Sequence, residues 1–244
     1  MRVAVVADIH GNLSALEAII ADLKISAPDV VFHGGDLAAN GFRPAEVVDR
    51  IRELGWQGVC GNTDEMLWKP EIEQQLQQKA PSLGRLWKIL FQEMAPATLE
   101  RLGGERIEWL RSLPTVLQRD ELTIVHAAPR DLWRSPLANS TDEELEATYK
   151  ELGARTVVYG HIHAAFARTL PGFTVANTGA ASLSYDGDPR ASYVLVENGK
   201  VTHRRVEYDI QKEAAGLRAS GFPSSEWIAA ILCTGRYMNP PPQD

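Results

Sequence analysis

The chain has 244 residues, 44% of them hydrophobic, and no low-complexity block, so it is long enough to form one sizeable core. Its 25 basic and 32 acidic residues give a net charge of −7, which argues against bulk nucleic-acid binding, because phosphate contacts require clustered Lys and Arg. No apolar run approaches the roughly 20 residues that span a bilayer, so no membrane association is expected. Cys60 and Cys233 lack zinc-type spacing, and so few cysteines indicate a reducing compartment, which we take to be the cytoplasm.

The first part of the chain alternates between strand-like and helix-like patterns. Residues 2–7 are nearly all Val and Ala and predict a buried strand; Asp8 cuts the run too short for a signal peptide. Ser14 with Glu17 resembles a capping box and predicts a helix that follows it. Further strands are expected over 30–32 and 57–60. Between them, a helix should begin at Pro44 and stop near Gly55.

The second part begins with a change in character. Residues 64–113, rich in Gln, Glu, Lys, Leu and Trp, predict a helical insertion. Strands are expected over 122–126, 155–159 and 173–176, with a helix from the capping box of Thr141 and Glu144 to Gly153. Asn198-Gly199 predicts a hairpin turn between strands 191–197 and 200–208. A short helix near 224–234 and a loose tail over 239–244 complete a single domain, residues 1–244, whose C-terminal helix and tail occupy about 209–244.

Polar clusters follow five of the expected strands. They are Asp8-Ile9-His10-Gly11-Asn12, Gly35-Asp36, Gly61-Asn62, His126 and Gly160-His161-Ile162-His163. In open α/β sheets, functional side chains collect beyond the carboxyl ends of the strands. An i, i+2 spacing lets two side chains leave an extended segment on the same side. Imidazole, carboxylate and amide oxygen suit divalent Mn, Fe, Zn or Ni, and Asp36, alone after its strand, is the natural bridging carboxylate.

These clusters, in this order, resemble the calcineurin-like metallophosphoesterases. The series is Asp-x-His-Gly-Asn, Gly-Asp, Gly-Asn-x-Asp, a lone His after a strand, and Gly-His-x-His, and it extends over residues 3–208. The segment from His126 to Asp131 and the loop that begins at Asn177 are similar to a bacterial and archaeal phosphodiesterase-like branch of that family. The resemblance implies an α/β fold, a four-layer αββα sandwich of two mixed β-sheets flanked by helices.

The resemblance also implies two divalent metal ions with a shared ligand. The first would be held by Asp8, His10, Asp36 and His163, and the second by Asp36, Asn62, His126 and His161. Two cations roughly 3.5–4 Å apart hold a bridging water and lower its pKa, and the hydroxide formed attacks phosphorus in line. Asp36, Asn62 and Asp64 are therefore the expected catalytic residues, although Asp64 could equally brace its loop.

Other polar residues have weaker assignments. Asn12 follows Gly11 just before the first helix, where backbone N–H groups favour an anion, and it is a candidate for substrate binding. Arg130 and Arg190 are candidate phosphate contacts, because guanidinium matches phosphate geometry, although surface ion pairs would explain them equally well. His33 and His203 are expected to be structural. Of the tryptophans, Trp68 and Trp87 are candidates to line a substrate cleft.

One departure from the family pattern bears on specificity. Many members have Gly-Asn-His-Asp, whose His orients the substrate and protonates the leaving oxygen, whereas this chain has Thr63 at that place. A threonine hydroxyl does not titrate near neutral pH, so it cannot act as that general acid. We therefore expect either that the substrates have a leaving group that needs little protonation, or that water takes over this step.

The expected function is hydrolysis of phosphodiester bonds in a small phosphorylated substrate. Two alternatives on the same metal site are a dinucleoside polyphosphate hydrolase and a serine/threonine-type protein phosphatase. A non-catalytic scaffold that keeps the fold is an alternative from another class. Such scaffolds typically lose ligands, whereas all seven ligand positions are filled here.

Overall fold

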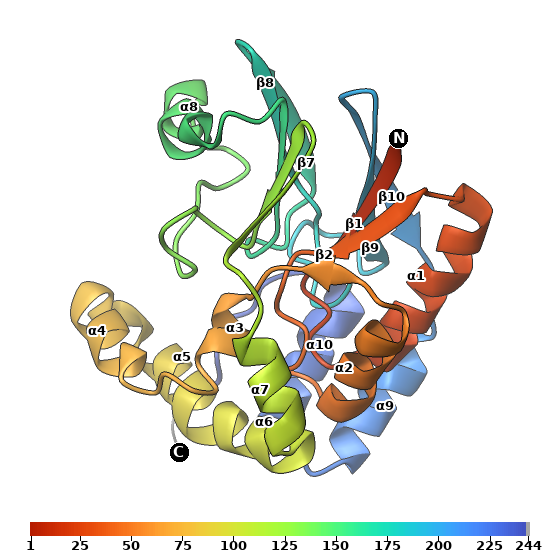
Figure 1. The fold of residues 1–244 in the computed structure, drawn as a ribbon. Coiled ribbons are helices and arrows are strands. Elements are labelled where there is room, and N and C mark those ends of the chain that lie inside the picture. Colours follow the sequence, from red (N-terminus) through yellow and green to blue (C-terminus); the bar gives the residue numbers. More distant parts are fainter. Residues whose placement is uncertain (243–244) are drawn as a thin grey trace.

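The computed structural model describes residues 1–242. Across these residues the backbone forms two mixed five-stranded sheets with helices outside them (Figure 1). This is the expected four-layer α/β sandwich. The last two residues of the expected tail, Gln243 and Asp244, lie outside the described residues. Within residues 1–242, no helix combines the length and apolar character needed to cross a bilayer.

The first sheet has the strand order β10-β9-β1-β2-β3. Its strands are β1 (Arg2–Val6), β2 (Val30–His33), β3 (Gln57–Gly58), β9 (Ala191–Glu197) and β10 (Lys200–Val206). Strands β1, β2 and β3 are parallel, and β9 and β10 form the predicted antiparallel hairpin. Asn198 and Gly199 both have positive φ, 51° and 77°, as the tightest hairpin turns require.

The second sheet has the order β4-β5-β6-β8-β7. Its strands are β4 (Val116–Arg119), β5 (Leu122–Val125), β6 (Thr156–Tyr159), β7 (Phe166–Leu170) and β8 (Phe173–Asn177). The sequence patterns indicated the parallel strands β5, β6 and β8 but missed β4 and β7. Both missed strands lie at the sheet edges and are partly exposed, so they lack a continuous apolar run.

Successive side chains of each strand point alternately to the space between the two sheets and to the helices outside them. In β1, Val3 and Val5 pack between the two sheets, whereas Ala4 and Val6 face the helices outside. In β6, Val158 points between the sheets and Tyr159 faces the other way. Because successive side chains of a strand point to opposite faces, strands that are apolar throughout are buried on both sides.

The helices that cover the sheets start mostly where the sequence indicates. They are α1 (Leu13–Ser26), α2 (Pro44–Glu53), α8 (Asp142–Tyr149), α9 (Ile210–Ala219) and α10 (Ser225–Thr234). The capping box of Thr141 and Glu144 is confirmed by both of its hydrogen bonds. The box expected at Ser14 is wrong: Asn12 caps α1 by accepting from the Ala15 N–H at 2.9 Å. Helix α9 was not anticipated.

The region expected as an insertion is helical. It contains α3 (Asn62–Glu65), α4 (Ile72–Lys79), a 3₁₀ turn (Pro81–Leu83), α5 (Gly84–Lys88), a π-helix η2 (Ile89–Met94), α6 (Ala95–Leu102) and α7 (Gly104–Arg111). In Figure 1 these helices, drawn in orange through yellow to light green, gather below the sheets on the same side as α10.

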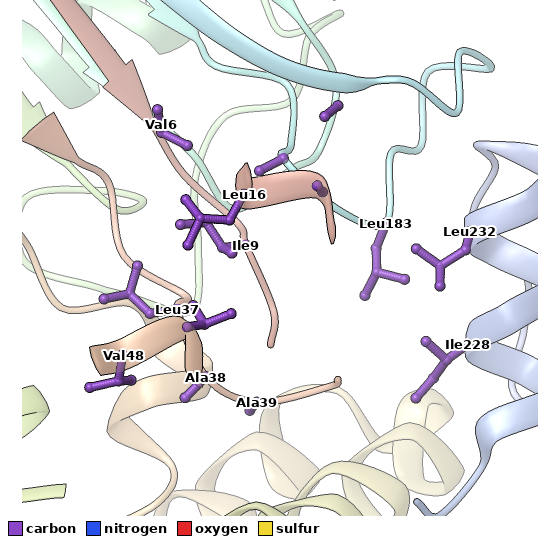
Figure 2. Packing of buried hydrophobic residues seen from close by; sticks show 14 of the residues in the cluster. Val6, Ile9, Leu16, Leu37, Ala38, Ala39, Val48, Leu183, Ile228 and Leu232 are labelled. Atoms are coloured by element: carbon purple, nitrogen blue, oxygen red, sulfur yellow. The ribbon is translucent and has the colours of Figure 1, made fainter. Parts of the chain in front are cut away.

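The C-terminal helices complete the main hydrophobic cluster. Figure 2 shows Ile9 from the loop after β1 and Leu37 from the loop after β2, with Leu183 facing Ile228 and Leu232 of α10. These side chains are all buried. The loops that follow β1 and β2 are therefore anchored in the core by Ile9 and Leu37. This anchoring fixes the polar residues next to them in the chain, Asp8, His10 and Asp36.

Candidate metal centre

The loops at the carboxyl ends of five parallel strands come together. These strands are β1, β2 and β3 of the first sheet and β5 and β6 of the second. Backbone hydrogen bonds join the first two loops, because the Asp8 N–H donates to Gly35 O and the His10 N–H to Asp36 O. The Gly160 N–H donates to His126 O and so joins the two loops of the second sheet. The first sheet therefore delivers three sets of polar side chains and the second sheet two, and all seven expected ligands come together there.

The first group of donors is Asp8, His10, Asp36 and His163, whose ligand atoms all lie within 4.8 Å of one another. His10 Nε2 lies 3.2 Å from His163 Nε2 and 3.6 Å from Asp36 Oδ2. His163 Nε2 lies 3.4 Å from Asp8 Oδ1. All four residues are buried.

The second group adjoins the first across Asp36. His126 Nε2 lies 2.8 Å from Asn62 Oδ1 and 3.5 Å from Asp36 Oδ1. His161 Nδ1 lies 2.9 Å from the same Asn62 oxygen. One oxygen of Asp36 thus faces His10 and the other faces His126, which is the arrangement of a bridging carboxylate.

The hydrogen bonds of the imidazoles show which nitrogen is free to bind a cation. Nδ1 of His10, His126 and His163 donates to the carbonyl oxygens of Ala39, Gly34 and Leu183 at 2.9, 2.8 and 2.7 Å. A neutral imidazole with Nδ1 protonated presents a bare lone pair at Nε2. Backbone carbonyls that fix the tautomer in this way are typical partners of metal-binding histidines.

The facing lone pairs indicate that the residues fit divalent cations. When His163 is neutral, the form that binds metal, its Nε2 and that of His10 direct lone pairs at each other across 3.2 Å, and His126 Nε2 faces an amide oxygen. A cation between these acceptors would remove the repulsion. Imidazole, carboxylate and amide donors suit the borderline divalent metals expected from the sequence.

Burial and neighbouring charges set the protonation of the donors. Burial lowers the pKa of His10 to about 4, helped by the positive charge of His163, and lowers that of His161 to about 3. For Asp8, burial opposes ionisation, but His163 and the other imidazoles bring the pKa to about 2. Near neutral pH, Asp8 is therefore a carboxylate and His10 and His161 are neutral, the forms that bind metal.

Unusual backbone conformations and close glycines bring the loops together. Asp8, His10, Asp36, His161 and His163 all have positive φ, between 50° and 70°. Non-glycine residues in this region are sparse and cluster at functional sites. A Cβ on Gly61 would overlap Asp36 Oδ1, and one on Gly160 would lie 2.6 Å from Asp8 Oδ2. Glycine is needed at both places because the loops approach so closely.

Asp64 braces the centre from behind. Its Oδ2 accepts from the N–H groups of Asp36 and Gly61 at 2.9 and 3.2 Å, and its Oδ1 accepts from those of Leu37 and Ala38 at 3.0 and 3.3 Å. Burial and the charge of Asp36 raise its pKa to about 6. With both oxygens engaged by the backbone, Asp64 holds the Asp36 loop in place; its expected catalytic role stays a prediction, and this geometry favours positioning.

The three residues expected to bind substrate do not reach the centre. Asn12 is buried, caps α1 and donates to Ser182 Oγ at 3.1 Å. Arg130 is exposed and pairs with Glu151, and Arg190 pairs with Asp188. Substrate contacts by these three residues stay predictions, and the observed ion pairs and cap account for them instead.

A pocket of about 230 Å³ opens from the metal centre toward the insertion and α10. Trp87 lines it as expected, whereas Trp68 does not. Trp133, Tyr185, Trp227 and Tyr237 also line it, and sequence patterns had not singled them out. They come from separate segments with no shared motif, so only the folded chain brings them together.

Comparison with known proteins agrees with this fold. The model of the calcineurin-like phosphoesterase superfamily domain matches residues 1–200. The chain belongs to this family of metallophosphoesterases, as its motifs indicated. Helices α9 and α10 follow the matched segment, and α10 adds part of the pocket wall.

Individual relatives cover the chain to different extents. An uncharacterised protein of Methanocaldococcus jannaschii is 28% identical over 96% of this chain and 98% of its own length. A symmetrical bis(5'-nucleosyl)-tetraphosphatase of Vibrio vulnificus is 27% identical, but the match spans 63% of this chain and 54% of that protein. The crystal structure of a metallophosphoesterase from Sphaerobacter thermophilus, 26% identical, superimposes with a TM-score of 0.78 and covers 96% of this chain and 100% of that one.

Proposed function

We propose that the protein hydrolyses phosphodiesters with two divalent cations, Mn, Fe, Zn or Ni, bridged by Asp36. The observation that carries the proposal is the position of Asp36, whose two oxygens face His10 at 3.6 Å and His126 at 3.5 Å. A single metal would need only one of the two donor groups. Such ions activate a water and neutralise charge on phosphoryl oxygens.

The residues of the chain would divide the remaining tasks. The His161 N–H donates to both carboxylate oxygens of Asp8, at 3.0 and 3.2 Å, and so holds this side chain in place. Oδ1 of Asp8 also lies 3.4 Å from His163 Nε2. Thr63 lines the pocket, and its buried hydroxyl has no hydrogen-bond partner within residues 1–242. It could donate to a phosphoryl oxygen but not act as an acid near neutral pH, which supports esters with good leaving groups.

The first test combines metal content with turnover. We expect close to two metals per chain in gently purified protein, and hydrolysis of bis(4-nitrophenyl) phosphate. Asp36→Asn should reduce this turnover by at least about 10³-fold, because the substitution removes the shared anionic ligand. Circular dichroism should show that the fold survives.

The control is Asp120→Asn, an exposed carboxylate in the turn between β4 and β5, which should keep both metals and full rate. Less than one metal per chain under metal-replete conditions would support the scaffold alternative. Full activity of Asp36→Asn would exclude the bridging role.

A second candidate, hydrolysis of dinucleoside polyphosphates, is supported by the similarity to the Vibrio vulnificus tetraphosphatase. The same two cations could serve that reaction. A panel of diesters, monoesters, dinucleoside polyphosphates and phosphopeptides, each run with several metals, separates these activities from one another. A cytoplasmic location, supported by the free thiols of Cys60 and Cys233, belongs to the same proposal.

A further inference from the structure

The pocket above the metal centre is walled by aromatic and aliphatic side chains. The insertion contributes Trp87 and Leu90, the loop after β5 contributes Trp133, and α10 contributes Trp227 and Ile231. Its floor contains Asp36 and the imidazoles of the metal centre. A group attached to a phosphoryl oxygen on the metals would therefore enter an apolar chamber.

The polar ends of the indoles point away from this chamber. The Nε1–H groups of Trp87, Trp133 and Trp227 donate to Ala80 O, Glu65 Oε2 and Met238 O at 3.2, 3.2 and 2.9 Å. With these donors satisfied elsewhere, the tryptophans offer the pocket their carbon surfaces. Buried aromatic rings arranged in this way favour contacts with other rings.

The aromatic wall is continuous with the metal centre. Tyr185 stacks on the metal-site imidazole of His163, with centroids 4.5 Å apart and planes inclined by 21°, and Tyr237 packs edge-on against Tyr185. On the opposite wall, Trp133 stacks on Phe91 of the π-helix at 5.5 Å. The rings on both walls are thus held by packing before any ligand enters.

The charge of the lining disfavours a highly charged ligand. Among the described residues, no lysine or arginine lines the pocket. A polyphosphate chain would place several negative charges beyond the metals, and such groups are recognised by guanidinium or ammonium donors. The overall charge of −7 would oppose it further.

The size of the pocket limits the ligand to about one ring system. Its volume, about 230 Å³, exceeds the roughly 150 Å³ of an engineered apolar cavity that holds benzene. Pockets for ligands of drug size run from roughly 300 to 1,000 Å³. One single or fused aromatic ring fits within this volume.

We propose that this aromatic pocket selects phosphoesters that carry one uncharged aromatic or apolar group on a single phosphoryl centre, and disfavours polyphosphates. This inference rests on the proposed function and names its substrate class. It assigns specificity to Trp133, Trp227 and their neighbours and not to the exposed arginines.

Non-hydrolysable phosphonates test the pocket separately from catalysis. Binding of methylphosphonate, phenylphosphonate, 1-naphthylphosphonate and 4-carboxyphenylphosphonate to the metal-loaded protein would be measured by calorimetry. We expect phenylphosphonate to bind about tenfold more tightly than methylphosphonate, since ring burial and aromatic contacts contribute at this scale. The naphthyl compound should bind at least as tightly as the phenyl compound, and the carboxyl group should weaken binding, because no cation faces it.

Substitutions of the pocket tryptophans test whether these side chains cause the preference for the phenyl compound. Trp133→Leu and Trp227→Leu should each reduce the phenyl-to-methyl preference at least about fivefold, because each removes ring contacts. Trp56→Leu, a tryptophan outside the lining, is the matched control and should retain the preference. If Trp133→Leu fails to fold, Trp227→Leu, which is only partly buried, still carries the test.

The outcomes separate this inference from the proposed function. Aromatic preference without turnover of bis(4-nitrophenyl) phosphate would support the pocket and contradict the hydrolysis. Turnover with equal affinity for methylphosphonate and phenylphosphonate would overturn the inference, as would tighter binding of the carboxylated compound.

Discussion

At the scale of single residues, most buried polar side chains near the candidate metal centre have hydrogen-bond partners, and His33 does not. Asp8, Asp36 and Asp64 all accept from backbone N–H groups, and the ligand imidazoles are oriented by carbonyls or by Asn62. His33 differs, because neither of its ring nitrogens has a hydrogen-bond partner within residues 1–242 and the residue is fully buried. It was expected to be structural, and the ring of Trp109 lies 6.1 Å from its own ring.

His33 should make stability depend on pH. Burial lowers its pKa to about 3, whereas in the unfolded chain the pKa is near 6.5. The unfolded state therefore binds the proton first, and stability falls as pH drops from about 6.5 toward 3. We expect His33→Leu to gain about 2 kcal/mol of unfolding free energy relative to the wild type between pH 7 and pH 5.

Urea unfolding of both proteins at several pH values measures this difference. The ligand histidines titrate in both proteins and cancel in the comparison. Parallel pH profiles of wild type and His33→Leu would show that His33 does not contribute.

At the scale of elements, the strand-end loops depend on glycines that carry no functional group. Gly61 has φ −100°, which any residue can adopt, so only its contact with Asp36 requires a glycine there. Gly61→Ala should displace Asp36, cost at least about 1–3 kcal/mol of unfolding free energy through overpacking, and reduce the metals bound per chain.

Gly84→Ala is the control for Gly61→Ala. No atom lies within 4 Å of its added Cβ, and Gly84 begins α5 with helical φ. This variant should keep both metals and be unchanged or slightly more stable. If Gly61→Ala binds as much metal as Gly84→Ala, the close approach of the two loops is not needed for the site.

Some helices and strands could be predicted from local sequence patterns, and others could not. Buried strands, the helix that starts at Pro44 and the Thr141 box follow from local chemistry, and the structure confirms them. The edge strands β4 and β7 escaped detection because half of their side chains face solvent and their pairing is decided by a neighbouring strand. Asn12 displaced Ser14 as the cap of α1 because its side chain alone accepts from a first-turn N–H.

At the scale of the whole molecule, the candidate metal centre connects the two sheets. Asp8 and Asp36 come from the first sheet, and His126 and His163 from the second. A ligand that binds only the folded arrangement stabilises it by about 2.7 kcal/mol at a hundred times its Kd. For a chain of this size, removing such metals should lower Tm by about 5–10 °C.

Thermal unfolding with and without a chelator checks this expectation. The Asp36→Asn variant serves as control, because its Tm should respond less to chelation. An unchanged wild-type Tm after verified metal loss would mean that the centre does not couple the sheets.

The sequence by itself determined the family, the layers of the fold and the candidate ligand set. Each of these features can be predicted from a short segment of the sequence. Each candidate ligand follows its own strand within a few residues, and a run of apolar residues indicates a buried strand. The tertiary structure decided which atoms face each other, including the two-sided position of Asp36 and the bracing contacts of Asp64. It also assembled the aromatic pocket, whose tryptophans and tyrosines lie far apart in the chain and share no spacing. Such a surface is defined by packing between distant segments, and packing leaves no periodic trace in the sequence.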